Sequence, residues 1–147
     1  MASYSVYTIE FESEAAIPSI DDLPEEVSNI SRECHKHENY ISIVEDIDFV
    51  IDNNLDRNEI IQKMANLPNT QRLAVCRCNN TTDTAEFTLY KCRDDLVEIY
   101  KISDSEASEP VFSTWDIKKE SGTYGEPSRE LIKEKYNFDA WTIWQIW

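Results

Sequence analysis

The stretch LAVCRCNNTTDTAEFTLYKCRDDLVEIYKIS, residues 73–103, decides the fold that we expect of this chain. It holds three runs rich in β-branched and aromatic residues, and each run has the length of a strand. Short polar segments separate the runs, and such segments join antiparallel neighbours. The stretch therefore predicts a β meander with strands at 73–78, 86–92 and 96–103, which a fourth strand at 111–118 extends.

The first turn of this meander also predicts a register. If the polar turn 79–84 pairs Cys78 with Ala85, the numbers of facing residues sum to 163, and Cys92 then faces Gln71. At the rise of an extended strand, Cys92 would lie roughly 24 Å from Cys78.

Two elements are expected upstream of the meander. Residues 3–11 alternate between apolar and polar, which predicts an edge or second-rank strand. Pro24 suits the first turn of a helix, and the acids that follow it favour the positive end of the helix dipole. One apolar stripe predicts that this helix continues to about His37; its members are Leu23, Val27, Ile30 and Cys34.

Residues 41–52 fit both a strand and a helix, and their β-branched residues favour the strand. Either structure places Asp46, Asp48 and Asp52 on one water-facing surface. The next helix is better defined, because Asp56 and Glu59 form a capping box. Its apolar stripe is Ile60, Ile61, Met64 and Leu67, and Pro68 with Asn69 ends it.

The C-terminal part is expected to add a short helix over 127–136 and a strand over 141–147. The three tryptophans of that strand close the core or anchor an interface, and the sequence leaves both open. The fold class predicted is α+β: a single acidic domain over 1–147, with an N-terminal strand and helices packed on an antiparallel β meander and a C-terminal helix and strand.

The charge of the chain is concentrated near its start. Residues 1–60 hold fifteen Asp and Glu against three Lys and Arg, whereas 61–147 hold fourteen against eleven, and the whole chain carries −15. A surface this negative repels nucleic acid and anionic membranes and attracts basic proteins. We therefore expect a basic protein partner, without direct nucleic-acid or membrane binding.

Composition excludes several other classes. With two glycines, the chain lacks the glycine-rich loops that cradle phosphates, so no nucleotide cofactor is expected. It has no apolar run long enough to span a membrane, and its first residues lead us to expect no signal peptide. Four cysteines without an export signal indicate reduced thiols and a cytoplasmic location.

Two groups of residues resemble metal sites, and each also has a structural explanation. Cys34 and His37 at helical spacing, with Cys76 and Cys78 on one strand face, offer four ligands for zinc, although the spacing matches no known finger and the cysteines also suit a core. Residues 52–58 resemble the start of a calcium loop, but Arg57 replaces the required glycine. Helix capping explains the same residues, so we predict no metal or other cofactor.

Catalytic patterns are equally weak. Glu45, Asp46 and Asp48 could serve metal-dependent hydrolysis, but the nearby residues supply no Lys or His. No nucleophile elbow is present. We predict that the chain is not an enzyme.

Three functions remain in order of preference. The first is an inhibitor that neutralises a basic partner, such as an immunity protein against a nuclease-type toxin; the likeness is one of size and charge, not of motif. The second is a DNA mimic with carboxylates about 7 Å apart along a strand, and the third is a zinc-stabilised domain or enzyme. An acidic surface that serves solubility alone is the bland alternative. The predicted partner-binding residues are Glu45, Asp46, Asp48, Asp52 and Asp56, with Asp21, Asp22, Glu25 and Glu26 at the edge. The oligomeric state is left open.

Overall fold

The computed structural model describes residues 3–79, 84–92, 97–103, 133–134 and 136–139. Its strands are β1 (Ser3–Phe11), β2 (Ser31–His37), β3 (Tyr40–Glu45), β4 (Thr70–Asn79), β5 (Thr84–Lys91) and β6 (Val97–Ser103). Its helices are α1 (Glu25–Ile30), α2 (Ile47–Asp52) and α3 (Arg57–Ala65), with the short 3-10 turns η1 (Glu14–Ala16) and η2 (Ile20–Asp22).

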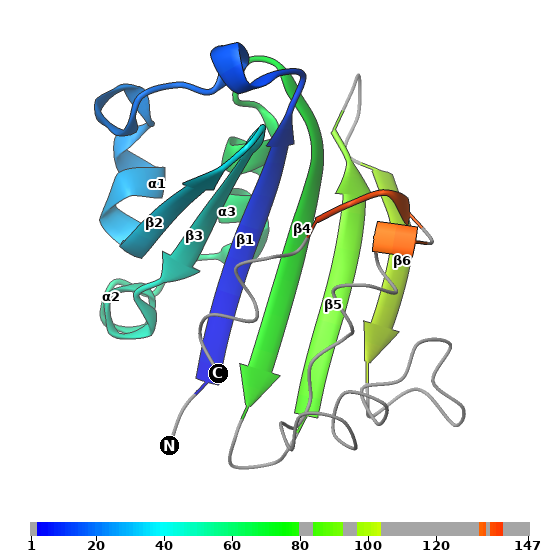
Figure 1. The fold of residues 1–147 in the computed structure, drawn as a ribbon. Coiled ribbons are helices and arrows are strands. Elements are labelled where there is room, and N and C mark those ends of the chain that lie inside the picture. The colour runs from blue at the N-terminus through cyan, green and yellow to red at the C-terminus, as the bar shows by residue number, and fades with distance from the viewer. Residues whose placement is uncertain (1–2, 80–83, 93–96, 104–132, 135, 140–147) are drawn as a thin grey trace.

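The strands form one antiparallel sheet in the order β2-β3-β1-β4-β5-β6 (Figure 1). The α+β class and the β4-β5-β6 meander are therefore confirmed. The expected edge position of β1 is wrong, because β1 pairs with β3 on one side and β4 on the other. Its alternating residues are buried: Tyr7, Ile9 and Phe11 on one face, Val6 and Thr8 on the other. A strand covered on both faces suits the centre of a sheet.

The predicted register of the first hairpin is confirmed. Cys78 pairs with Ala85, and the same register holds to the other end of the hairpin, where Arg72 pairs with Lys91. One residue further on, the backbone N–H of Cys92 donates to the carbonyl of Gln71 at 2.9 Å.

The helix expected over 23–37 ends early. Val27 and Ile30 are buried on α1 as the stripe predicted, but the chain turns into β2 at Ser31. β2 then pairs with β3 through a two-residue turn, in which Glu38 takes the left-handed φ of 52°. Pairing with β3 outweighs the helical pattern here, because tertiary contacts override weak local propensity.

Residues 41–52 divide between the two predicted structures. The first part is β3, whose six residues are all buried. The strand preference is wrong beyond it, because residues from Ile47 onward form α2. Asp46 makes the change possible, since its carboxylate accepts a hydrogen bond from the Phe49 N–H at 3.2 Å and caps the new helix.

All three helices cover the same face of the sheet (Figure 1). The core between them joins Tyr7, Ile9 and Ile43 of the sheet to Val27 of α1 and Met64 of α3, each of which is fully buried. Burial of such side chains contributes roughly 2 kcal/mol each to folding. The opposite face also holds buried residues, among them Phe87 and Leu89, and the buried Phe138 of the C-terminal segment lies over Tyr40 on that face.

Three C-terminal expectations lie wholly or largely outside the described residues: the strand at 111–118, the strand at 141–147 and most of the helix at 127–136. Of that helix, Lys133, Glu134 and Tyr136 are described and are helical. Among the helices of the described residues, none combines the length and apolar character that a membrane crossing requires.

Candidate protein-binding surface

The helical layer carries a set of exposed carboxylates that we call the acidic helical surface. It extends from η2 over α1, α2 and the first turn of α3, and α1 contacts both of the other helices. Eight exposed acids define it: Asp21, Asp22, Glu25, Glu26, Asp48, Asp52, Asp56 and Glu59. All the predicted partner-binding residues except Glu45 and Asp46 belong to this surface.

Two apolar side chains are exposed within the acidic helical surface. Ile51 is 64% exposed and Leu55 is 36% exposed, and these are the exposed large hydrophobic residues of the described chain. Ile51 lies three residues after Asp48 and next to Asp52, so the three share one side of α2. The sequence pattern indicated the acids but not the exposure of these two apolar neighbours.

A pocket of about 160 Å³ opens between the three helices beside Leu55. Its apolar walls are Phe49, Leu55 and Ile60, and its charged lining residues are Glu26, Asp56, Glu59 and Lys63. The Nζ atom of Lys63 lies 3.3 Å from a carboxylate oxygen of Glu26, which ties α3 to α1 at the surface. The pKa of Glu26 is lowered by a hydrogen bond from its own backbone and then by Lys63. Three carboxylates against one ammonium leave the pocket negative.

Two of the predicted partner-binding acids are helix caps. Asp46 caps α2, and Asp56 caps α3 by accepting a hydrogen bond from the Asn58 N–H at 2.8 Å. The predicted helix cap at Asp56 is thus confirmed. Asp46 is half-buried, whereas Asp56 remains exposed at the pocket. Asp46 therefore serves the fold first, and Asp56 also faces solvent.

Glu45 lies in the protein interior, away from the acidic helical surface. Its side chain is fully buried, and its carboxylate accepts hydrogen bonds from the Tyr7 hydroxyl at 2.8 Å and from the Arg57 guanidinium at 3.3 and 3.2 Å. Burial and then the charge of Glu45 raise the pKa of Tyr7 well above its usual range. This cluster joins β1, β3 and α3, and both carboxylate oxygens of Glu45 accept hydrogen bonds within it.

The three carboxylates of the DNA-mimic hypothesis do not lie along one strand. That hypothesis placed Asp46, Asp48 and Asp52 along a strand, but they lie at the cap, in the first turn and at the end of α2. Asp48 and Asp52 are one helical turn apart. The regular strand array that motivated the hypothesis is absent from this part of the described chain.

The candidate zinc ligands Cys34 and Cys76 are not brought together. Cys34 lies on β2, and the register runs from it through Ile43 and Tyr7 to Val75. Cys76 follows Val75, so it points to the opposite face of the sheet, about 14 Å away across three strand spacings. The helical spacing of Cys34 and His37 is also wrong, since both lie on a strand. The side chain of Cys78 lies outside the described residues.

The thiols have the character of core residues. Cys34 and Cys92 are free and half-buried, and Cys76 is buried. Burial raises the pKa of Cys34, and burial followed by the charge of Glu10 raises the pKa of Cys92 to about 11. Thiols that resist ionisation make poor nucleophiles and poor metal ligands at neutral pH.

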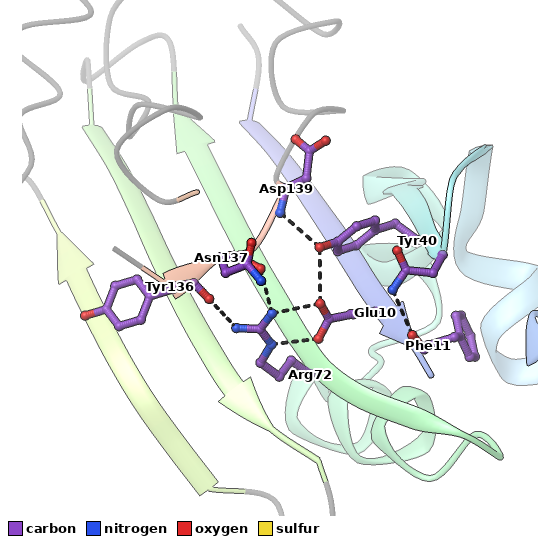
Figure 2. A network of polar contacts seen from close by, with 8 residues as sticks. Glu10, Phe11, Tyr40, Arg72, Tyr136, Asn137 and Asp139 are labelled. Atoms are coloured by element: carbon purple, nitrogen blue, oxygen red, sulfur yellow. Dashed lines mark hydrogen bonds and ion pairs between the residues drawn. The ribbon is translucent and has the colours of Figure 1, made fainter. Parts of the chain in front are cut away.

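A second polar network fastens the C-terminal segment to the sheet (Figure 2). Arg72 of β4 holds both carboxylate oxygens of Glu10 on β1, at 2.7 Å each, and donates to the carbonyls of Tyr136 and Asn137 at 2.6 and 2.8 Å. The Tyr40 hydroxyl donates to Glu10 at 3.1 Å and accepts from the Asp139 N–H at 3.3 Å. The network links segments more than sixty residues apart in sequence. We call it the Arg72 network.

Beside this network, ligand atoms of His37, Glu38 and Asp139 lie within 4.8 Å of one another. The Nε2 atom of His37 is 3.4 Å from a carboxylate oxygen of Asp139, which is almost fully buried. Both histidines of the chain, His35 and His37, are half-buried on β2. The contact between His37 and Asp139 joins the β2–β3 hairpin to the C-terminal segment.

No family model, curated protein or solved structure matches this chain. We therefore infer function from the residues of the acidic helical surface.

Proposed function

We propose that this chain is a non-enzymatic cytoplasmic protein that binds and neutralises a basic protein, as an immunity protein neutralises a nuclease-type toxin. One observation carries the proposal: eight exposed carboxylates and the two exposed apolar residues Ile51 and Leu55 lie on one helical layer. A charged rim around an apolar centre is the usual anatomy of a protein interface.

The charge of this layer is not balanced by neighbouring bases. Residues 1–31 contain no Lys, Arg or His, and none occurs between Glu38 and Asp56. Of the bases on α3, Arg57 is used by Glu45, and Lys63 pairs with Glu26. The negative field therefore extends into solvent, over about 10 Å at moderate ionic strength. Such a field accelerates encounter with a positively charged surface such as a nuclease active site.

The apolar residues would act after encounter. Ile51 and Leu55 lose contact with water when a partner covers them, and burial of apolar surface at the centre of an interface slows dissociation. We assign rapid association to the acids and residence time to the apolar pair. Glu45 and Asp46 are excluded from the contact set, because the first is buried and the second caps α2.

The test is affinity capture from source-cell lysate with matched variants. Asp48→Lys/Asp52→Lys reverses two charges beside Ile51, and Glu14→Lys/Glu33→Lys makes the same net change at exposed acids outside the acidic helical surface. We expect the wild-type chain and the control to retain one basic protein that the first variant loses.

Association kinetics with that protein then decide the mechanism. We expect the Asp48→Lys/Asp52→Lys variant to associate at least about tenfold more slowly and with a weaker salt dependence. Equal association rates for the two variants, or capture of no basic protein, would contradict the proposal.

A further inference from the structure

We infer that the pocket between α1, α2 and α3 receives an arginine side chain of the basic partner. The inference deepens the proposed function and rests on it for the identity of the ligand as a protein side chain. It adds a specific anchor point to the acidic helical surface.

The shape and chemistry of the pocket suit a long cationic side chain. Phe49, Leu55 and Ile60 provide apolar walls, and the carboxylates of Asp56 and Glu59 lie among the lining groups. Arginine combines an apolar stem with a charged end, so the stem can pack along such walls while its guanidinium meets the carboxylates. An uncharged apolar side chain would leave those carboxylates partly desolvated without a partner.

The pocket already accommodates a cation from within the chain. Lys63 lines it and pairs with Glu26 at 3.3 Å, so one of its three carboxylates is satisfied. Asp56 uses one oxygen to cap α3, and the described residues provide no ion pair for Glu59. One more positive charge is therefore favourable beside Asp56 and Glu59.

Arginine is favoured over lysine because more than one acid lines the pocket. A guanidinium presents five donors in a planar fork, which can serve two carboxylates at once, whereas an ammonium acts as a point charge. The half-buried Phe49 also lines the pocket, and an aromatic ring attracts a guanidinium group. These features commit the inference to one ligand, an arginine side chain.

The test uses small probes, so it does not depend on finding the partner. The ¹⁵N-labelled full chain is titrated with N-acetyl-arginine amide, with the lysine analogue and with N-acetyl-citrulline amide, which has nearly the shape of arginine without its charge. We expect saturable shifts at Asn29, Asn53 and Glu59 with the arginine probe in the millimolar range. The lysine probe should bind more weakly, and citrulline should give no saturable shift.

Matched variants separate the pocket from the general charge. Asp56→Asn/Glu59→Gln removes two charges at the pocket while asparagine retains the helix cap, and we expect it to weaken the arginine probe about fivefold. Asp48→Asn/Asp52→Asn removes the same charge from α2 outside the pocket, and should change the affinity by less than about twofold.

Three outcomes would overturn the inference: no saturable shift with the arginine probe, equal shifts with citrulline, or equal losses in the two double variants. Each is distinguishable from failure of the proposed function. A basic partner whose association depends on Asp48 and Asp52, with an unresponsive pocket, would retain the function and remove the arginine anchor. Saturable binding of the arginine probe without capture of any basic protein would contradict the proposed function and retain the preference of the pocket for arginine.

Discussion

The sheet and the helical layer use their carboxylates differently. Glu10 and Glu45 in the sheet are largely or fully buried and each contacts an arginine, whereas Asp48, Asp52 and Glu59 on the helices lie in solvent. The difference follows from the sequence, because the strand register brings Arg72 directly opposite Glu10 while α2 contains no base at all. A carboxylate whose cation is placed by the fold stabilises the fold, and one without such a cation remains available to a partner.

Among the variants that test this contrast, Arg57→Met should have the largest effect on the free energy of unfolding. It leaves the Glu45 carboxylate fully buried without its cation, which we expect to lower the free energy of unfolding by about 3 kcal/mol. Chemical denaturation measures the change. Arg32→Met is the control, because Arg32 pairs with Glu33 at the surface with both side chains about half exposed, and it should cost less than about 0.5 kcal/mol. Equal losses of stability in the two variants would show that burial does not determine how much each ion pair contributes to the free energy of unfolding.

Arg72→Met should be the next most costly change, at about 2 kcal/mol, because it removes the charged partner of Glu10 and two donors to backbone carbonyls. It should also loosen the C-terminal segment. Hydrogen exchange at the Asp139 amide, which donates to Tyr40, is expected to accelerate more than exchange in β3. Unchanged exchange at Asp139 would mean that Arg72 does not hold that segment.

Alkaline pH should weaken the Arg72 network. Burial, followed by the charge of Glu10, raises the pKa of Tyr40 from about 10 to about 12, against the lowering effect of the Asp139 N–H. The unfolded chain then loses this proton at a lower pH than the folded chain, so stability is full below pH 10 and falls as pH rises to 12.

We expect Tyr40 to account for about 1 to 2 kcal/mol of that fall. The measurement is the free energy of unfolding across this pH range for wild type and Tyr40→Phe. The variant should fall less steeply, while the slope due to Tyr7 remains. Identical slopes would contradict the assignment to Tyr40.

Asp46→Ala tests an acid that is intermediate between the buried carboxylates of the sheet and the exposed carboxylates of the helices, because Asp46 is half-buried and caps α2. Loss of its bond to the Phe49 N–H should cost about 1 kcal/mol, whereas Asp46→Asn should be nearly neutral because asparagine caps helices equally well. Thermal unfolding distinguishes the variants. If alanine and asparagine were equally harmful, the charge of Asp46 rather than its cap would be responsible.

The smallest effect on stability should follow Asp48→Asn/Asp52→Asn. Both acids are exposed and contribute to no buried contact, so the free energy of unfolding should change by less than about 0.5 kcal/mol. Denaturation of the variant beside wild type provides the check. A loss similar to that of Arg72→Met would place these acids among the structural carboxylates and remove the basis of the contrast.

The parts of the fold that the sequence predicted best are those with local signals. The β4–β5 register followed from the polar turn between two strands, and α3 followed from Asp56 and Glu59. The chain over 31–37 was mispredicted because Cys34 continued a helical stripe, while the determinant of β2 is its pairing with β3. Local periodicity does not contain such a pairing.

The site was predicted in part for the same reason. A local excess of Asp and Glu in the sequence predicts exposed acids, so Asp48, Asp52 and their neighbours could be identified. Burial of Glu45 could not, because it depends on Tyr7 and Arg57 from other elements. The pocket was also missed, since its walls come from three helices that only the folded chain brings together.

The central position of β1 has a consequence for synthesis. Val6 pairs with Val44 on one side and Cys76 on the other, so the strand leaves the ribosome long before its second partner is made. At ribosomal rates of about 5–20 residues per second, it waits for seconds with its pairing groups unprotected. Residues 1–31 carry seven acids and no base, and like charges keep nascent chains apart. Before the acids of η2 and α1 meet any partner, they are expected to protect β1 from aggregation.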